Sequence, residues 1–424
     1  MIVLVIGGGG REHAIVRKLK ESKKIDHIYC APGNGGIAKD AECVDIKATD
    51  LVRMLAFAKE HAVDFAVVAP DDPLVLGMVD AFEAAGIRTF GPDKKAAEIE
   101  GSKVFSKNLM KKYQIPTADY AVFDDPADVL RYIREKDQYP TVIKADGLAL
   151  GKGVVIAQNL EEAEAAVHSI MEDKIFGASG NKVVVEEFLT GPEVSVLAFT
   201  DGNCIKPMIS SMDHKRVFDG NLGPNTGGMG TIAPNPFYTE ADAQVCMEKI
   251  FLPTIRAMKS EGRTFKGCLY FGLMLTPQGP KVIEYNCRFG DPETQVVLPL
   301  LKTDLFEIFE AIYENRLEEL SIEWRDGAAA CVVMASGGYP KKYITGLPIT
   351  GLNPDGQLDG VTVYHAGTKL ADDGGMQTAG GRVLGVTAVG ADLPEALERA
   401  YAGVARIDFT AAHYRHDIGT AYHR

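Results

Sequence analysis

A glycine-rich stretch in the middle of the chain has the residue types of a phosphate-binding loop. Lys144 ends an apolar, strand-like run, and Lys152 follows it among the three glycines Gly147, Gly151 and Gly153. Glycines let backbone N–H groups approach phosphate oxygens, and lysine ammonium groups neutralise the phosphate charge. The stretch is not a Walker A loop, because glycine rather than Ser or Thr follows Lys152 and a strand comes next. We expect a nucleotide phosphate site here, with a plain glycine-rich hairpin as the alternative.

A second group of polar residues alternates along one strand near residue 285. Glu284, Asn286 and Arg288 should share one face of this strand. The apolar residues between them should pack in the core: Ile283, Tyr285, Cys287 and Phe289. Carboxylate and amide oxygens suit Mg²⁺, which takes few protein ligands and completes its shell with phosphates. Glu284 and Asn286 therefore predict a Mg²⁺ (or Mn²⁺) site, and Arg288 can hold a phosphate or carboxylate through two hydrogen bonds.

Four consecutive glycines, residues 7–10, separate an apolar run from a helical pattern at the start of the chain. Such a turn can present a helix N-terminus to a phosphate group. A dinucleotide fingerprint would need glycine at position 12, where Glu12 stands, and an acid after the second strand, where Cys30 precedes Ala-Pro. A nicotinamide-dependent oxidoreductase is therefore disfavoured. A site for a smaller phosphate ligand and a merely tight turn both remain open, and His13 is expected to serve helix packing.

A third glycine-rich segment, residues 223–230, follows the polar run Asp213-His-Lys-Arg216. Its glycines allow a close backbone approach to an anion, and the basic residues before it can line such a site. A flexible surface loop explains the same pattern equally well.

The elements that must position these residues fall into three groups. Strands alternate with helices over residues 1–101, which predicts a doubly wound parallel sheet. Residues 102–325 combine a lid-like α+β module at about 115–190 with a strand pair around residue 278. Residues 326–424 contain short strands, glycine turns and one helix, which predict a small mixed domain.

Composition narrows the classes of function. The chain has 424 residues and a net charge of −13, which disfavours a general nucleic-acid binder. No apolar run is long enough to cross a membrane, and the short apolar start is expected to be a strand rather than a signal peptide. The seven cysteines form no CxxC pair, so reduced thiols in a cytoplasmic enzyme are expected. We expect a monomer.

Taken together, these motifs resemble the ATP-grasp superfamily and, within it, the phosphoribosylamine–glycine ligase family. The resemblance covers nearly the whole chain and is carried by residues 5–13, 31–34, 144–153, 223–230 and 284–293. It implies an N-terminal sheet domain, an ATP-grasp core with a mobile lid module, and a small C-terminal domain. It also implies that ATP and a divalent metal convert glycine to glycyl phosphate, which 5-phosphoribosylamine then attacks.

The resemblance assigns roles to individual residues. Lys103 and Lys144 should meet ATP phosphates, the region from Glu186 to Leu189 adenine, and Glu193 the ribose hydroxyls. The expected ATP-binding set is Lys103, Lys144, Gly147, Gly151, Lys152, Gly153, Glu186, Glu187, Phe188, Leu189 and Glu193. The expected set for glycine and phosphoribosylamine is Gly9, Gly10, Arg11, Glu12, Lys215, Asn225, Thr226, Gly227, Arg288 and Asp291. Lys144, Asp213 and Arg288 are the expected catalytic residues.

Two other activities stay open at this point. One is an ATP-grasp ligase or carboxylase that acts on another carboxylate, and the other is a non-catalytic nucleotide-binding regulator. The Gly-Arg-Glu-His motif at residues 10–13 and the 223–230 segment disfavour the first. Retention of Lys144, Glu284 and Asn286 disfavours the second.

Overall fold

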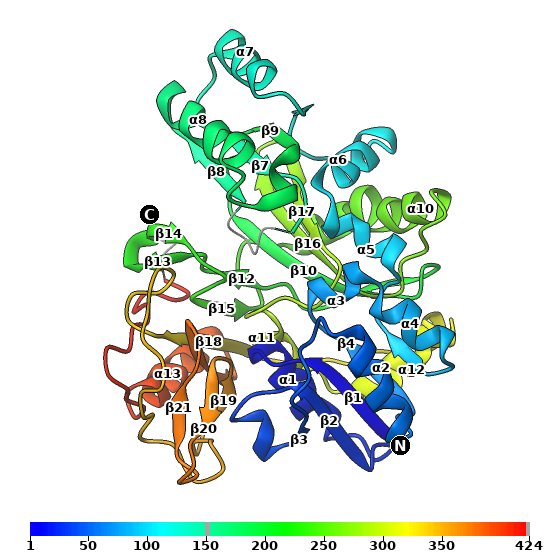
Figure 1. The fold of residues 1–424 in the computed structure, drawn as a ribbon, viewed down its shortest axis with the longest axis vertical. Coiled ribbons are helices and arrows are strands. Elements are labelled where there is room, and N and C mark those ends of the chain that lie inside the picture. The colour runs from blue at the N-terminus through cyan, green and yellow to red at the C-terminus, as the bar shows by residue number, and fades with distance from the viewer. Residues whose placement is uncertain (149–152, 421–424) are drawn as a thin grey trace.

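The computed structural model describes residues 1–148 and 153–420, and Gly151 and Lys152 of the predicted phosphate loop lie outside them. Figure 1 shows three lobes: the N-terminal and C-terminal parts lie side by side below, and a smaller lobe of helices and strands rises above. Within the described residues, no helix is both long enough and apolar enough to cross a membrane.

The N-terminal lobe contains a parallel five-stranded sheet in the order β3-β2-β1-β4-β5, as the strand–helix alternation predicts. The strands are β1 Ile2–Gly7, β2 His27–Pro32, β3 Glu42–Cys43, β4 Phe65–Val68 and β5 Arg88–Phe90. The helices are α1 Gly10–Leu19, α2 Leu51–Glu60, α3 Asp71–Leu76, α4 Met78–Ala84 and α5 Lys94–Gly101. Leu4 and Ile6 pack in one core cluster with α2, whereas Val3 and Val5 pack in another with α1. The sheet is apolar on both faces because both are covered.

The upper lobe is an antiparallel sheet in the order β6-β9-β7-β8, and it forms the predicted lid module. Its strands are β6 Tyr120–Phe123, β7 Thr141–Ala145, β8 Val154–Ala157 and β9 Val183–Glu187. Helices α7 Pro126–Lys136 and α8 Leu160–Val167 close a small apolar core over it. In the chain, the predicted phosphate loop connects β7 to β8.

Below the lid lies an antiparallel sheet in the order β11-β10-β16-β17. Its strands are β10 Glu193–Thr200, β11 Ile205–Pro207, β16 Gly267–Thr276 and β17 Gly279–Asn286, of which the last two form the predicted hairpin. Helices α6 Lys103–Lys112, α9 Glu240–Cys246, α10 Leu252–Ser260 and α12 Leu305–Tyr313 pack around it. Strand β17 is at the sheet edge, facing the lid.

The C-terminal lobe contains a five-stranded sheet in the order β12-β15-β18-β22-β19, and two of its strands come from the middle of the chain. The strands are β12 Met212–Asp213, β15 Gly230–Ala233, β18 Ala328–Ala335, β19 Thr362–His365 and β22 Arg382–Gly390. Helix α13 Leu393–Val404 packs on the sheet, and α11 Thr294–Val297 lies beside it. Two ribbons complete the lobe: β13 Arg216–Phe218 with β14 Leu222–Asn225, and β20 Thr368–Leu370 with β21 Met376–Thr378. Strand β12 follows β11, the edge strand of the central sheet, directly in the chain. The C-terminal sheet therefore lies beside the central sheet, and it places residues 213–230 there.

Candidate active site

Lys103 and Lys144 converge on the phosphate loop from different elements. Ser102 caps α6, its hydroxyl accepting a hydrogen bond from the Phe105 amide, and this places Lys103 at the first turn. The Lys103 ammonium donates to the Gly147 carbonyl at 2.9 Å. Burial lowers the pKa of Lys103 from its ordinary value. The described start of the loop is therefore tied to a half-buried lysine.

Lys144 and Glu186 lie on the neighbouring lid strands β7 and β9. The Lys144 Nζ atom is 3.0 Å from Glu186 Oε1 and donates to the Ile283 carbonyl at 3.1 Å. Lys107, which the sequence patterns did not single out, is 3.0 Å from the other oxygen of Glu186. Its signal was available, because Lys103 and Lys107 are four residues apart and share one face of a helix.

Strand β17 carries Glu284 and Asn286, whereas Arg288 lies beyond its end and not on the predicted strand face. The predicted alternation also fails at Ile283. A β-bulge leaves Ile283 as the extra residue between the pairs formed by Val282 and Glu284. Ile283 is consequently half-buried and lines the cleft instead of joining the core, and Val282 is the fully buried residue. The core prediction is therefore wrong for Ile283, and the bulge explains how its carbonyl can meet Lys144.

Glu284 is surrounded by positive charge. Lys215 Nζ lies 3.6 Å from Glu284 Oε1 and 3.6 Å from Glu193 Oε2. Burial alone would raise the pKa of Glu284, but Lys215, Lys144 and Lys103 outweigh it and hold the pKa below the usual range. Burial would likewise lower the pKa of Lys215, yet Glu193 and Glu284 keep it well above its ordinary value. Glu284 is thus an anion at neutral pH, as a metal ligand must be.

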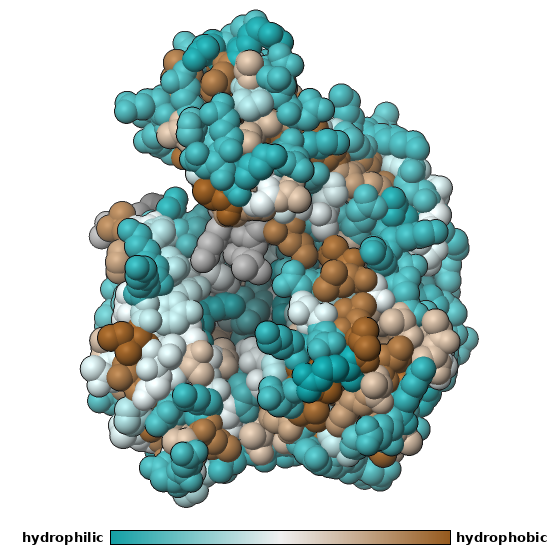
Figure 2. All heavy atoms as spheres, in the orientation of Figure 1, coloured by the Kyte–Doolittle hydropathy of each residue, from teal (hydrophilic) through white to brown (hydrophobic). Residues whose placement is uncertain are grey.

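A narrow cleft beside these charges contains Glu193, Asp213, Lys215, Tyr270 and Glu284. Figure 2 shows that the molecule is hollowed between its lobes and that hydrophilic surface lies within the hollow. Burial, followed by the charge of Glu293, raises the pKa of Asp213 well above its ordinary value.

Ser195 and Tyr270, which line the cleft, form a buried polar chain with Glu293 that no motif predicted. The Ser195 hydroxyl is 2.8 Å from the Tyr270 hydroxyl and donates to Glu293 Oε1 at 3.1 Å. Serine and tyrosine inside apolar strands gave no signal in the sequence, because such residues are usually structural.

Arg288 stands at the junction of the central sheet and the N-terminal lobe. Its guanidinium donates to Glu100 Oε1 at 3.0 Å and to Asn286 Oδ1 at 3.1 Å. It also donates to the Phe289 carbonyl, as Arg11 does from α1, each at 3.2 Å. Arg11 and Arg288 are therefore brought together at the Phe289 carbonyl.

Asp291 lies between the N-terminal and C-terminal lobes. Arg382 of β22, another residue that sequence patterns did not single out, is 3.1 Å from Asp291 Oδ2 and donates to the Asp291 carbonyl at 2.9 Å. The same arginine donates to the Gly227 carbonyl at 2.7 Å. The C-terminal lobe thus helps to hold the 223–230 segment against Asp291.

The N-terminal glycine turn is organised by Glu12. Gly9 caps α1, and its N–H donates to Glu12 Oε2 at 2.6 Å. Glu12 is buried and its other oxygen accepts from Arg11 Nε at 2.6 Å. A Cβ atom at Gly9 would be 3.5 Å from Asp291 Oδ2, so this turn faces the same junction. Gly10 begins the helix beside it.

The remaining predicted residues lie at the edges of this cluster. The Thr226 hydroxyl donates a hydrogen bond to the Lys215 carbonyl at 2.8 Å, whereas Asn225 and Gly227 are exposed. Glu187 is exposed and 3.6 Å from Lys281, while Phe188 and Leu189 are half-buried beside it. Gly153 is buried, and its carbonyl accepts from the Ala145 amide at 2.8 Å.

Comparison with known proteins finds one family over most of the chain. Models of phosphoribosylglycinamide synthetase match in three parts: the N domain at residues 1–100, the ATP-grasp (A) domain at 101–294 and the C domain at 329–421. A phosphoribosylamine–glycine ligase of Caldanaerobacter subterraneus is 50% identical over 422 residues and is covered completely by this chain. That of Escherichia coli K12 is also 50% identical over 422 residues, which are 99% of this chain and 98% of the relative.

Solved structures agree with the sequence relatives. The phosphoribosylamine–glycine ligase of Thermotoga maritima superposes with a TM-score of 0.85 at 33% identity, covering 99% of this chain and 100% of that one. The biotin carboxylase domain of a Hydrogenobacter thermophilus 2-oxoglutarate carboxylase, solved with MgADP and bicarbonate, has a TM-score of 0.75 at 17% identity. It covers 97% of this chain and 91% of its own, and at that identity the likeness concerns the fold alone.

Proposed function

The chain belongs to the phosphoribosylglycinamide synthetase family and is an ATP-dependent carbon–nitrogen ligase, and we propose that it joins glycine to 5-phosphoribosylamine through glycyl phosphate. The observation that carries the proposal is the meeting of Lys103, Lys144 and Lys215 around Glu284. Three lysines around one carboxylate suit a nucleoside triphosphate: the lysines would neutralise its phosphates, and the carboxylate would hold its metal ion.

The first step transfers the γ-phosphoryl group of ATP to glycine. A glycine carboxylate oxygen forms the new bond to phosphorus, and the bond to the bridging oxygen of ADP breaks. We assign Lys103, Lys144 and the 147–153 loop to the phosphates, with Lys152 and Gly151 placed by the family resemblance. Glu186–Leu189 would hold adenine and Glu193 the ribose. The buried lysines support this because they can neutralise phosphate charge without rearranging.

Glu284 and Asn286 fit a Mg²⁺ site. They supply a carboxylate and an amide oxygen from one strand, and the lowered pKa of Glu284 keeps the carboxylate charged. A bound Mg²⁺ would neutralise the triphosphate and align it. Among the described residues there is no group of three His, Cys, Asp or Glu side chains that could hold a metal by itself, which agrees with phosphates completing the shell.

In the second step the amine of phosphoribosylamine attacks the acyl carbon, and phosphate leaves. We place glycine near Asp213, Arg288 and Asp291, and the ribose phosphate at Gly9–Arg11 on the N-terminus of α1, with Glu12 ordering that turn. Lys215, Asn225, Thr226 and Gly227 would border the two substrates. Closure of the lid would keep water from the acyl phosphate.

We also propose that the chain divides into domains at residues 1–101, 102–325 and 326–424. The ranges matched by the three family models support this division. The pairing of β12 and β15 with β18 means that the last two units share a sheet.

The proposal is tested with glycine labelled with ¹⁸O in its carboxylate. Each turnover should place one labelled oxygen in the released phosphate, because carbon–oxygen cleavage leaves the former carboxylate oxygen on phosphorus. ADP release should also need glycine and phosphoribosylamine together. Unlabelled phosphate would exclude the acyl phosphate intermediate. If ADP were released equally fast without phosphoribosylamine, the ligase reaction would be excluded.

A further inference from the structure

Lys107 is a buried cation that the proposed mechanism leaves without a role. It lies one turn after Lys103 on α6 and is 2% exposed. Its Nζ atom is 3.0 Å from Glu186 Oε2 and donates to the Thr117 hydroxyl at 2.8 Å. Burying a lysine is costly unless it is paired, so its contacts are the feature to explain.

The contacts of Lys107 close a ring that joins the lid to the body. Thr117 donates onward to the Val282 carbonyl at 2.7 Å. On the other side Glu186 is 3.0 Å from Lys144, which donates to the Ile283 carbonyl. The ring therefore passes through α6, the lid strands β7 and β9, and the bulged edge of β17.

Within this ring, one carboxylate oxygen of Glu186 is free to accept a hydrogen bond from a ligand. Glu186 is 5% exposed, and its Oε1 atom accepts no hydrogen bond from the described part of the chain, although Lys144 lies nearby as an ion-pair partner. Leaving a buried acceptor without a hydrogen bond is unfavourable, and Lys144 offsets this through its charge alone. A ligand N–H directed at this atom would supply the missing hydrogen bond.

On the premise that ATP occupies the proposed site, we propose that Lys107 is a positioning residue that sets the purine specificity of the enzyme by holding Glu186 Oε2 so that Oε1 faces the base. The 6-amino group of adenine can donate a hydrogen bond to this oxygen. Guanine carries a 6-oxo group there, so two acceptors would face each other across a dry site. With Lys107 in place, Glu186 cannot turn to avoid that contact.

The surroundings of Lys107 predict a pH dependence. It faces Glu186 from β9, Lys144 from β7, Lys281 from β17 and the Tyr120 ring of β6, 5.7 Å away. Burial lowers the pKa of Lys107 to about 8, against the attraction of Glu186. As the pH rises through 8, Lys107 loses its charge and its ion pair with Glu186. The KM for ATP should therefore rise. Arginine stays charged throughout this range.

The experiment compares Lys107→Met and Lys107→Arg, with Lys111→Met as the matched control from the exposed side of the same helix. Lys107→Met should raise the KM for ATP and lower the ATP-over-GTP preference in kcat/KM, each by about tenfold or more, while the KM for glycine stays within about twofold. Lys107→Arg should keep the preference and abolish the rise in KM between pH 7 and pH 9. Lys111→Met should behave as the wild type.

Two results would overturn the role of Lys107. One is a Lys107→Met enzyme that keeps the wild-type ATP-over-GTP ratio. The other is a wild-type KM for ATP that stays flat from pH 7 to pH 9, a measurement that needs no variant to fold. Lys144→Ala separates this outcome from failure of the proposed function. If Lys144→Ala leaves the KM for ATP unchanged, the ATP site itself is misplaced; if it abolishes binding while Lys107→Met changes nothing, only the specificity role fails.

Discussion

The Arg288 guanidinium makes a structural ion pair and is also the group that we propose for a substrate carboxylate or phosphate. It is paired with the buried carboxyl of Glu100, which also accepts from the Cys287 amide at 2.7 Å. Its Nε atom is buried and makes no hydrogen bond with the described residues. One edge of the guanidinium therefore holds the protein together, and another remains available to a substrate carboxylate or phosphate.

A pair of substitutions separates the two tasks. Arg288→Met should lower the free energy of unfolding by about 3 kcal/mol, because it leaves Glu100 buried without its partner. Adding Glu100→Gln should recover most of that stability in urea unfolding. The kcat of both variants should remain depressed on the order of 100-fold, as for loss of one charge-stabilising donor. A double variant with restored activity would show that Arg288 serves stability alone.

At the scale of elements, the position of Asp213 depends on a close approach between two segments. Gly228 has φ +116°, and a Cβ atom there would be 2.5 Å from Asp213 Oδ1 and 2.4 Å from Pro292 Cδ. Contacts this short cannot persist, so any side chain at this position must push apart β12 and the segment that carries Asp291.

Gly228→Ala should therefore reduce kcat/KM for glycine by about tenfold or more, since small displacements of positioned groups are costly to catalysis. Gly279→Ala is the matched control, because Gly279 has a similar φ of +109° but an added Cβ atom there would meet nothing within 4 Å. Both variants carry the same kind of backbone strain, and only the first meets the site. Steady-state kinetics for glycine and for ATP measure the difference, and equal losses in the two variants would contradict it.

Elements whose signal is local were predictable, and contacts that depend on distant chain were not. The β16–β17 hairpin and the Ser102 cap follow from alternation, a turn and one capping side chain. The bulge at Ile283 does not follow from a local pattern, because the Ile283 carbonyl contacts Lys144 on another sheet. Likewise β12 and β15 are too short for the sequence to predict that β12 pairs with β15 and β15 with β18.

The same distinction applies to the site residues. Glu284 and Lys144 stand in runs with their own pattern, so residue types were enough to propose them. Tyr270 and Arg382 become candidates only when the folded chain brings them to Ser195 and Asp291. Lys107 shares a helix face with Lys103, but its importance shows only in its contact with Glu186.

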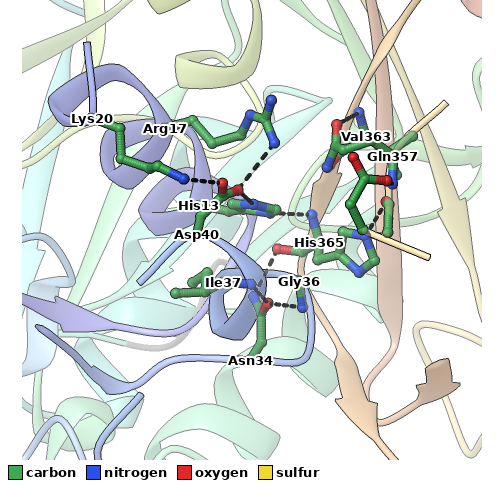
Figure 3. A network of polar contacts seen from close by, with 12 residues as sticks. His13, Arg17, Lys20, Asn34, Gly36, Ile37, Asp40, Gln357, Val363 and His365 are labelled. Carbon is green, nitrogen blue, oxygen red and sulfur yellow. Dashed lines mark hydrogen bonds and ion pairs between the residues drawn. The ribbon is translucent and has the colours of Figure 1, made fainter. Parts of the chain in front are cut away.

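At the scale of the whole molecule, the N-terminal and C-terminal lobes are joined through buried histidines. Figure 3 shows His13 of α1 between Asp40 and the backbone of His365: its Nε2 is 3.0 Å from Asp40 Oδ2, and its Nδ1 accepts from the His365 amide at 2.7 Å. The His365 ring is fully buried, with Nε2 2.8 Å from the Gly356 carbonyl. Asn34 donates to the His365 carbonyl at 2.8 Å. This network packs the His13 ring into the junction of the two lobes.

Neutral buried histidines make the junction of the lobes sensitive to acid. Burial lowers the pKa of His365 to about 3, whereas an exposed histidine in the unfolded chain has a value of about 6.5. Between these values the unfolded chain binds a proton that the folded chain does not. The free energy of unfolding must therefore fall as the pH falls below 6.5, by about 1.4 kcal/mol per pH unit for each such histidine.

Urea unfolding at pH 5.0, 5.5 and 6.0 measures this slope directly. His365→Gln, whose amide can still donate to the Gly356 carbonyl, should be less sensitive to pH than the wild type by about one proton, whatever its own stability. His168→Gln, at an exposed position of the lid, should keep the wild-type slope. Acidification should also open the junction before the lid core, because the buried histidines of the described residues, His13, His214 and His365, all lie outside the lid. A His365→Gln slope equal to that of the wild type would show that the acid sensitivity arises elsewhere, for instance at His214, where burial lowers the pKa to about 4.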